Sequence, residues 1–86
     1  MSDQISILRR AQRALGNLQK NDYERVKDII RKLSADPRPS GCLKLAGRDG
    51  WRIRVGNYRV IDEINDSEEI VTILSIGHRK DIYREP

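Results

Sequence analysis

Arginine recurs in the stretch from Trp51 to Arg79, which reads WRIRVGNYRVIDEINDSEEIVTILSIGHR. Arg52 and Arg54 alternate with apolar residues there, and Arg59 follows the dipeptide Gly56-Asn57 after one further residue. A guanidinium group stays charged at physiological pH and presents a planar fork of donors that matches a phosphate or a carboxylate. The residue types and their spacing therefore point to a surface that binds a polyanion or an acidic segment of another protein.

The same pattern also permits less specific interpretations. Carboxylates such as Glu63 or Asp49 could neutralise the arginines, or water could solvate them. A catalytic reaction is harder to derive from the residues, because the sequence has no paired-carboxylate signature, no glycine-rich phosphate loop and no serine nucleophile motif. Cys42 and His78 could form a dyad, but they lie far apart in the sequence with no residue to orient them. Taken alone, His78 and Tyr83 are more often packing residues than catalysts.

The strands that carry these arginines can be predicted from alternation. In Trp51–Val55 the apolar residues occupy one face of an extended chain and Arg52 and Arg54 the other. Gly56-Asn57 predicts a two-residue hairpin with a type II′ turn, because glycine stands first. The resulting register pairs Val55 with Tyr58, Ile53 with Val60 and Arg54 with Arg59, so Arg52, Arg54 and Arg59 share one face.

A last strand is predicted at Ile70–His78, after the polar turn Asn65–Glu69. If Ile64 opposes Ile70, then Ile61 opposes Ile73, Arg59 opposes Ser75, and Arg79 joins the arginines. A shift of one residue in the longer turn would reverse the faces of this strand. The opposite face of the sheet is expected to be apolar and to comprise Trp51, Ile53, Val55, Val60, Ile64, Leu74 and Ile76.

Two amphipathic helices are expected to cover that apolar face. Their stripes have helical spacing and consist of Leu8, Ala11, Leu15 and Leu18, followed by Val26, Ile29, Ile30 and Leu33. Asn21 is expected to cap the second helix, which ends before Asp36-Pro37-Arg38-Pro39. Short strands are possible at Asp3–Leu8 and Leu43–Leu45. The predicted fold class is α+β, with an N-terminal α-hairpin packed on one face of a small, largely antiparallel sheet.

The totals predict one small domain spanning residues 1–86, with a formal net charge of +4. The single cysteine, Cys42, allows no disulfide within the chain, and no Cys/His metal-binding spacing is present. We expect neither a metal nor a cofactor. No apolar run approaches the length of a membrane span, and the N-terminus lacks a signal-peptide pattern, so we expect a cytoplasmic protein without a membrane partner.

Two longer runs, KLAGRDGWRIRVGNYRVIDEI and VTILSIGHRKDIYR, together resemble the RelE/ParE superfamily of toxins from bacterial and archaeal type II toxin–antitoxin systems. The resemblance covers nearly the whole chain and favours the RelE branch. It implies a metal-independent endoribonuclease, or mRNA interferase, that enters the ribosomal A site, cleaves mRNA by attack of a 2′-OH on phosphate and inhibits translation. The implied partners are a cognate antitoxin, mRNA and the ribosome, with operator DNA bound only through the antitoxin complex.

The resemblance also implies roles for individual residues. Arg52 and Arg54 match positions where relatives carry basic residues on the same strand, often lysines, and Arg59 would contact the phosphate. Arg79 would stabilise the transition state or assist the leaving group, and Tyr83 would stack on a base or orient the 2′-OH. Arginine is a poor general base, so His78 is the preferred candidate for that role. Further RNA contacts are expected from Lys44, Arg48 and Lys80.

Two alternatives remain open on the sequence. The first is a ParE-like toxin that inhibits gyrase without ribonuclease activity, although that branch generally lacks the set of arginine, histidine and tyrosine found here. The second is a degenerate toxin that persists as a partner of the antitoxin and operator. Asp62 departs from the resemblance, since many relatives have tyrosine at this position, and we expect Asp62 on the apolar face near the margin of the sheet.

Overall fold

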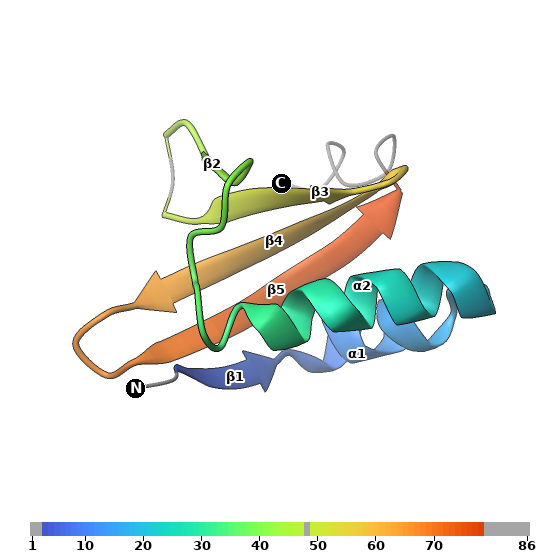
Figure 1. The fold of residues 1–86 in the computed structure, drawn as a ribbon, viewed down its shortest axis with the longest axis horizontal. Coiled ribbons are helices and arrows are strands. Elements are labelled where there is room, and N and C mark those ends of the chain that lie inside the picture. Colours follow the sequence, from blue (N-terminus) through green and yellow to red (C-terminus); the bar gives the residue numbers. More distant parts are fainter. Residues whose placement is uncertain (1–2, 48, 79–86) are drawn as a thin grey trace.

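The computed structural model describes residues 3–47 and 49–78, and within them one sheet has the strand order β1-β5-β4-β3-β2 (Figure 1). β1 runs parallel to β5, and the other neighbouring strands are antiparallel. The predicted α+β fold class is therefore confirmed. In chain order the elements are β1 (Gln4–Ile7), α1 (Arg9–Gly16), α2 (Lys20–Lys32), β2 (Leu43–Lys44), β3 (Trp51–Val55), β4 (Tyr58–Asn65) and β5 (Ile70–His78).

Both helices pack on the same face of the sheet, which we call the helix-covered face (Figure 1). Apolar residues from α1 and α2 meet alternate residues of the three long strands there, as the amphipathic stripes predict. Neither helix in the described ranges has the length and apolar character that crossing a membrane would need. The buried core comprises Ala11, Val26, Ile30, Leu33, Ile53, Val55, Val60, Val71, Ile73 and Ile76.

The starts of both helices differ from the sequence prediction. Leu8 lies before α1 in an extended conformation and is 40% exposed, because its N–H donates to the carbonyl of Ile73 and so continues β1. α2 begins at Lys20, and no side chain caps it. The predicted cap at Asn21 is wrong, since the N–H of Tyr23 already donates to the carbonyl of Gln19 and places Asn21 inside the first turn.

The β3–β4 hairpin has the predicted register. Val55 opposes Tyr58, and Arg54 opposes Arg59. Gly56 has a φ of 60°, whereas Asn57 is not among the described residues with positive φ. This combination fits a type II′ turn and excludes type I′, which needs positive φ at both central positions. The two-residue turn thus fixes which residues of β3 and β4 share a face.

The predicted register between β4 and β5 is wrong. The turn after Asn65 contains Glu69 with a φ of 56°, and it brings Val71, not Ile70, opposite Ile64. A β-bulge between Ile61 and Asp62 then adds a second shift of one residue, because β5 contributes the additional residue Leu74 there. The first shift places Val71 and Ile73 in the core, and the second keeps Ile76 on the helix-covered face. Leu74 accordingly lies outside the buried core.

Candidate functional site

The other side of the sheet carries Arg52, Arg54 and Arg59, and we call it the arginine face. Arg54 lies directly opposite Arg59 in the ladder between β3 and β4, and Arg52 lies opposite Ile61. Like charges in directly opposed positions destabilise an antiparallel pair unless an anion or a carboxylate lies between them. The arrangement is therefore suited to bind a group with concentrated negative charge.

The three arginines differ in exposure. Arg54 is exposed and Arg52 is half-buried, whereas Arg59 is only 7% exposed. Ile61, two residues further along the same face of β4, is also buried. Burial restricts the rotamers of a long side chain, so the guanidinium of Arg59 is held in place before any ligand arrives, while that of Arg54 can adjust to the ligand.

His78 does not join these arginines. It lies opposite Tyr58 in the ladder between β4 and β5, and the two rings pack edge to face with their centroids 5.7 Å apart. Tyr58 packs against the buried core, so both rings belong to the helix-covered face. Gly77, not His78, opposes Arg59. His78 thus lies on the face where its alternation with Ile76 also places it in the predicted register, and its ring lies against Tyr58 and away from the arginines. Its role as a general base stays a prediction.

Lys44 also lies away from the arginine face. It opposes Trp51 in the pair between β2 and β3, so the neighbouring Leu43 is the residue that faces the same way as Arg52. Lys44 is exposed and borders a hollow at the end of the sheet. The other predicted site residues lie outside the described ranges, and they are Arg48, Arg79, Lys80 and Tyr83. The predicted position of Arg79 on the arginine face is therefore not tested.

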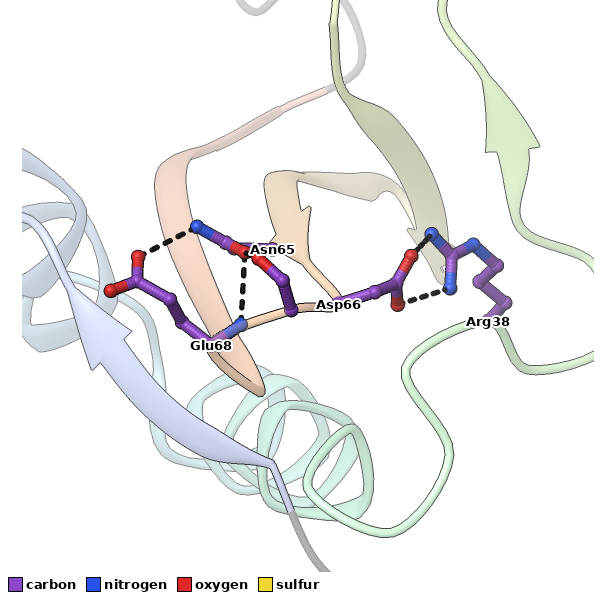
Figure 2. A network of polar contacts seen from close by, with 5 residues as sticks. Arg38, Asn65, Asp66 and Glu68 are labelled. Atoms are coloured by element: carbon purple, nitrogen blue, oxygen red, sulfur yellow. Dashed lines mark hydrogen bonds and ion pairs between the residues drawn. The ribbon is translucent and has the colours of Figure 1, made fainter.

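Another basic residue at this end of the sheet, Arg38, joins the start of β3 to the turn after β4, and the sequence did not predict this role. Its guanidinium lies 5.1 Å from the centroid of the Trp51 ring. Its two terminal nitrogens donate to the two carboxylate oxygens of Asp66 at 3.0 and 2.9 Å (Figure 2). This bidentate pair lowers the pKa of Asp66. Trp51, expected in the core, is half-buried instead and serves as the platform for Arg38.

Asp62 lies on the helix-covered face, as predicted, and its side chain is fully buried. Neither of its carboxylate oxygens has a hydrogen-bond partner in the described part of the protein. Burial raises the pKa of Asp62 to about 7, although the positive charge of Arg38 acts in the opposite direction. A carboxyl group in this setting is a cost to stability and has no access to a ligand on the arginine face.

Comparison with known proteins assigns a family to this geometry. A sequence model described as the ParE toxin of the type II toxin–antitoxin system, parDE, matches residues 5–83. A curated relative named RelE1, from Methanocaldococcus jannaschii, is 27% identical over 90 residues that cover 100% of both chains.

Solved structures have the same fold. A chain in the crystal structure of the archaeal RelE–RelB complex from Pyrococcus horikoshii is 28% identical with a TM-score of 0.80, covering 94% of this chain and 99% of that one. A chain in the toxin–antitoxin complex RelBE2 from Mycobacterium tuberculosis is 24% identical with a TM-score of 0.81, covering 92% of this chain and 100% of that one. With the family match over most of its length, the chain belongs to the RelE/ParE superfamily, as a toxin of a type II toxin–antitoxin system.

Proposed function

We propose that this toxin is a RelE-type mRNA interferase, a metal-independent endoribonuclease that cleaves mRNA in the ribosomal A site and thereby inhibits translation. The observation that supports it best is the directly opposed pair of Arg54 and Arg59, one exposed and one held by burial. A phosphodiester approaching this pair would be met by charge that is already in position. Such preorganised charge is the largest single source of stabilisation in many enzymes.

The proposed reaction needs no group beyond the RNA and the protein. The ribose 2′-oxygen attacks the adjacent phosphorus, the bond from phosphorus to the 5′-oxygen breaks, and the products carry a 2′,3′-cyclic phosphate and a 5′-hydroxyl. Arg52, Arg54 and Arg59 would bind the phosphate and stabilise the charge that develops on it, and Arg79 would assist from the end of the last strand. Because His78 lies on the helix-covered face, we assign the transfer of the proton from the 2′-OH to Tyr83. Tyr83 is the residue that the resemblance places next to the 2′-OH.

The proposal includes a cognate antitoxin that binds and silences the toxin. The complexes from Pyrococcus horikoshii and Mycobacterium tuberculosis pair RelE-like toxins with their antitoxins, which supports this step. Translating ribosomes and mRNA are the other proposed partners, and operator DNA would be bound only through the antitoxin complex. A target on the ribosome places the proposed activity in the cytoplasm.

Expression in growing cells, followed by mapping of mRNA 5′ ends, tests the proposal. The wild-type chain should arrest growth and produce new 5′ ends within translated reading frames. The variant Arg54→Gln/Arg59→Gln should lose these ends, whereas Lys27→Gln, which removes a positive charge from α2, should retain them. Growth arrest without new mRNA ends would refute the ribonuclease proposal.

A second candidate is a ParE-like toxin that inhibits gyrase, because the matching family is described by the ParE toxin. This candidate predicts cleavage complexes of gyrase on DNA after expression, with intact mRNA. The same cultures can be examined for both kinds of damage, so a single experiment separates the two activities.

A further inference from the structure

A hollow of about 590 Å³ lies beside β4 at the end of the sheet away from the β3–β4 turn. It forms because pairing with β3 stops at Asp62, so the last residues of β4 have no strand on that side. Glu63 and Thr72 extend the arginine face to the hollow, since they oppose each other and continue the alternation that begins at Arg59. The hollow is thus continuous with the arginine face but lies further along β4 than Arg59.

The charges around the hollow differ from those of the arginine face. Asp66 is already neutralised by its bidentate pair with Arg38 (Figure 2). The carboxylates of Asp49 and Glu63 line the hollow in addition, and both residues are exposed. Lys44 supplies the opposing positive charge. The local balance is therefore negative, which repels the phosphates of RNA and attracts a cation.

The wall of the hollow includes an aromatic residue, Trp51, that already contacts a guanidinium group. The guanidinium of Arg38 lies 5.1 Å from the centroid of the Trp51 ring. An aromatic ring next to carboxylates is the combination that binds arginine side chains, through a cation–π contact and charge-assisted hydrogen bonds. Arg38 makes both kinds of contact within this molecule, one with the Trp51 ring and the other with the Asp66 carboxylate.

We propose that the hollow accepts an arginine side chain of the antitoxin, from a segment whose acidic residues cover the arginine face. This inference rests on the proposed antitoxin partner and specifies how that partner is recognised. Four residues separate Arg59 from Glu63 along β4, or about 13 Å at the rise of an extended strand. An extended partner segment therefore needs an acidic residue and an arginine about four positions apart, and the two opposite charges fix its direction and register.

A peptide titration tests this inference on the full-length chain. The probe is an acetylated extended peptide with two glutamates, a short neutral spacer and one arginine, and its matched control replaces the arginine by the neutral isostere citrulline. The chain has one tryptophan, so the indole N–H of Trp51 gives a single NMR signal that reports on the hollow. We expect the arginine peptide to bind at least about fivefold more tightly than the citrulline peptide, the effect of roughly one ion pair with a cation–π contact.

The protein variants supply the second comparison. In Asp49→Asn/Glu63→Gln the ratio of the two affinities should fall to about one, whereas in Asp22→Asn, in the first turn of α2, it should stay unchanged. Equal affinities for the two peptides on the wild-type chain would overturn the inference. A shift of the indole signal with a single-stranded RNA oligonucleotide but with neither peptide would also overturn it. Because the readout is binding and not RNA cleavage, it stands or falls separately from the ribonuclease proposal.

Discussion

The two faces of the sheet treat a buried charge in opposite ways. Arg59 and Asp62 lie three residues apart on β4 and face opposite sides, and both are nearly or completely buried. Arg59 lies among other arginines on the face that the helices leave uncovered. Asp62 lies under the helices, where burial raises its pKa to about 7 and favours the neutral form. β4 therefore holds a nearly buried positive charge on its open side and a buried carboxyl group, at a cost to stability, on the side under the helices.

If the arginine face carries the activity, removing its held guanidinium should have the largest effect. Arg59→Ala should reduce mRNA cleavage by about 100-fold or more, the usual effect of deleting a preorganised group that stabilises developing charge. Arg59→Lys should recover part of this loss, since it restores the charge without the planar fork. Cleavage rates on translating ribosomes provide the measurement, and an Arg59→Ala enzyme with normal rates would place the activity elsewhere.

On the helix-covered face, truncation of a core side chain should lower the free energy of unfolding. Ile73 is fully buried at the centre of the core, so Ile73→Ala should cost about 2–5 kcal/mol of the free energy of unfolding. Unfolding in urea provides the measurement. The matched control is Thr72→Ala, because Thr72 neighbours Ile73 on the partly exposed opposite face. Equal losses for the two variants would contradict the assignment of faces on β5.

The protonation of Asp62 should make stability depend on pH. Its pKa is raised in the folded state, so the folded protein holds a proton that the unfolded chain releases near pH 4. The stabilisation is therefore complete at low pH and is lost as the pH rises through about 7. Asp62→Asn should remove this dependence. Between acid and alkaline pH, the free energy of unfolding of the variant should therefore rise relative to that of wild type by at most about 4 kcal/mol.

Asp28 provides a control with the opposite sign. Hydrogen bonds from Lys32 and Arg31 lower the pKa of this exposed carboxylate, so its stabilisation is lost as the pH falls. Asp28→Asn should therefore change stability slightly, and in the opposite direction to Asp62→Asn over the pH range. Urea unfolding of both variants between acid and mildly alkaline pH gives the comparison, and parallel profiles for wild type and Asp62→Asn would refute the role of Asp62.

The smallest effect on cleavage is expected from His78. Because its ring packs against Tyr58 on the helix-covered face, His78→Gln should change the cleavage rate by less than about threefold. The pH profile of cleavage should also keep its shape in this variant. A loss comparable to that of Arg59→Ala would show that His78 acts on the RNA despite its position in the sheet.

The first hairpin could be predicted from sequence because its turn leaves no freedom. Gly56-Asn57 fixes a two-residue connection, and the faces of Arg52, Arg54 and Arg59 follow from it. The second hairpin could not, because Glu69 adopts a left-handed conformation that glycine or asparagine would have signalled. The bulge on β5 has no sequence signature either.

The candidate site was predictable to the same extent as the strands that carry it. Arg52, Arg54 and Arg59 were placed correctly on one face. The predicted alternation also put His78 on the opposite face with Ile76, but the choice of His78 as general base took no account of that face. Arg38 was missed because its partners lie far along the chain, Trp51 beyond the proline-rich connector and Asp66 in the later turn. Such tertiary contacts depend on how the connector crosses the sheet, which no local pattern specifies.

We propose that the arginine face stabilises the attack of a ribose 2′-OH on the neighbouring phosphate. The most direct measurement uses purified ribosomes on an mRNA with an empty A site, with a single ribose at the cleavage position replaced by 2′-deoxyribose. Wild-type toxin is expected to cleave the all-ribose mRNA to a 2′,3′-cyclic phosphate and a 5′-hydroxyl, and the single substitution should abolish this cut. Cleavage at the same bond in the deoxy-substituted mRNA would exclude attack by the 2′-OH.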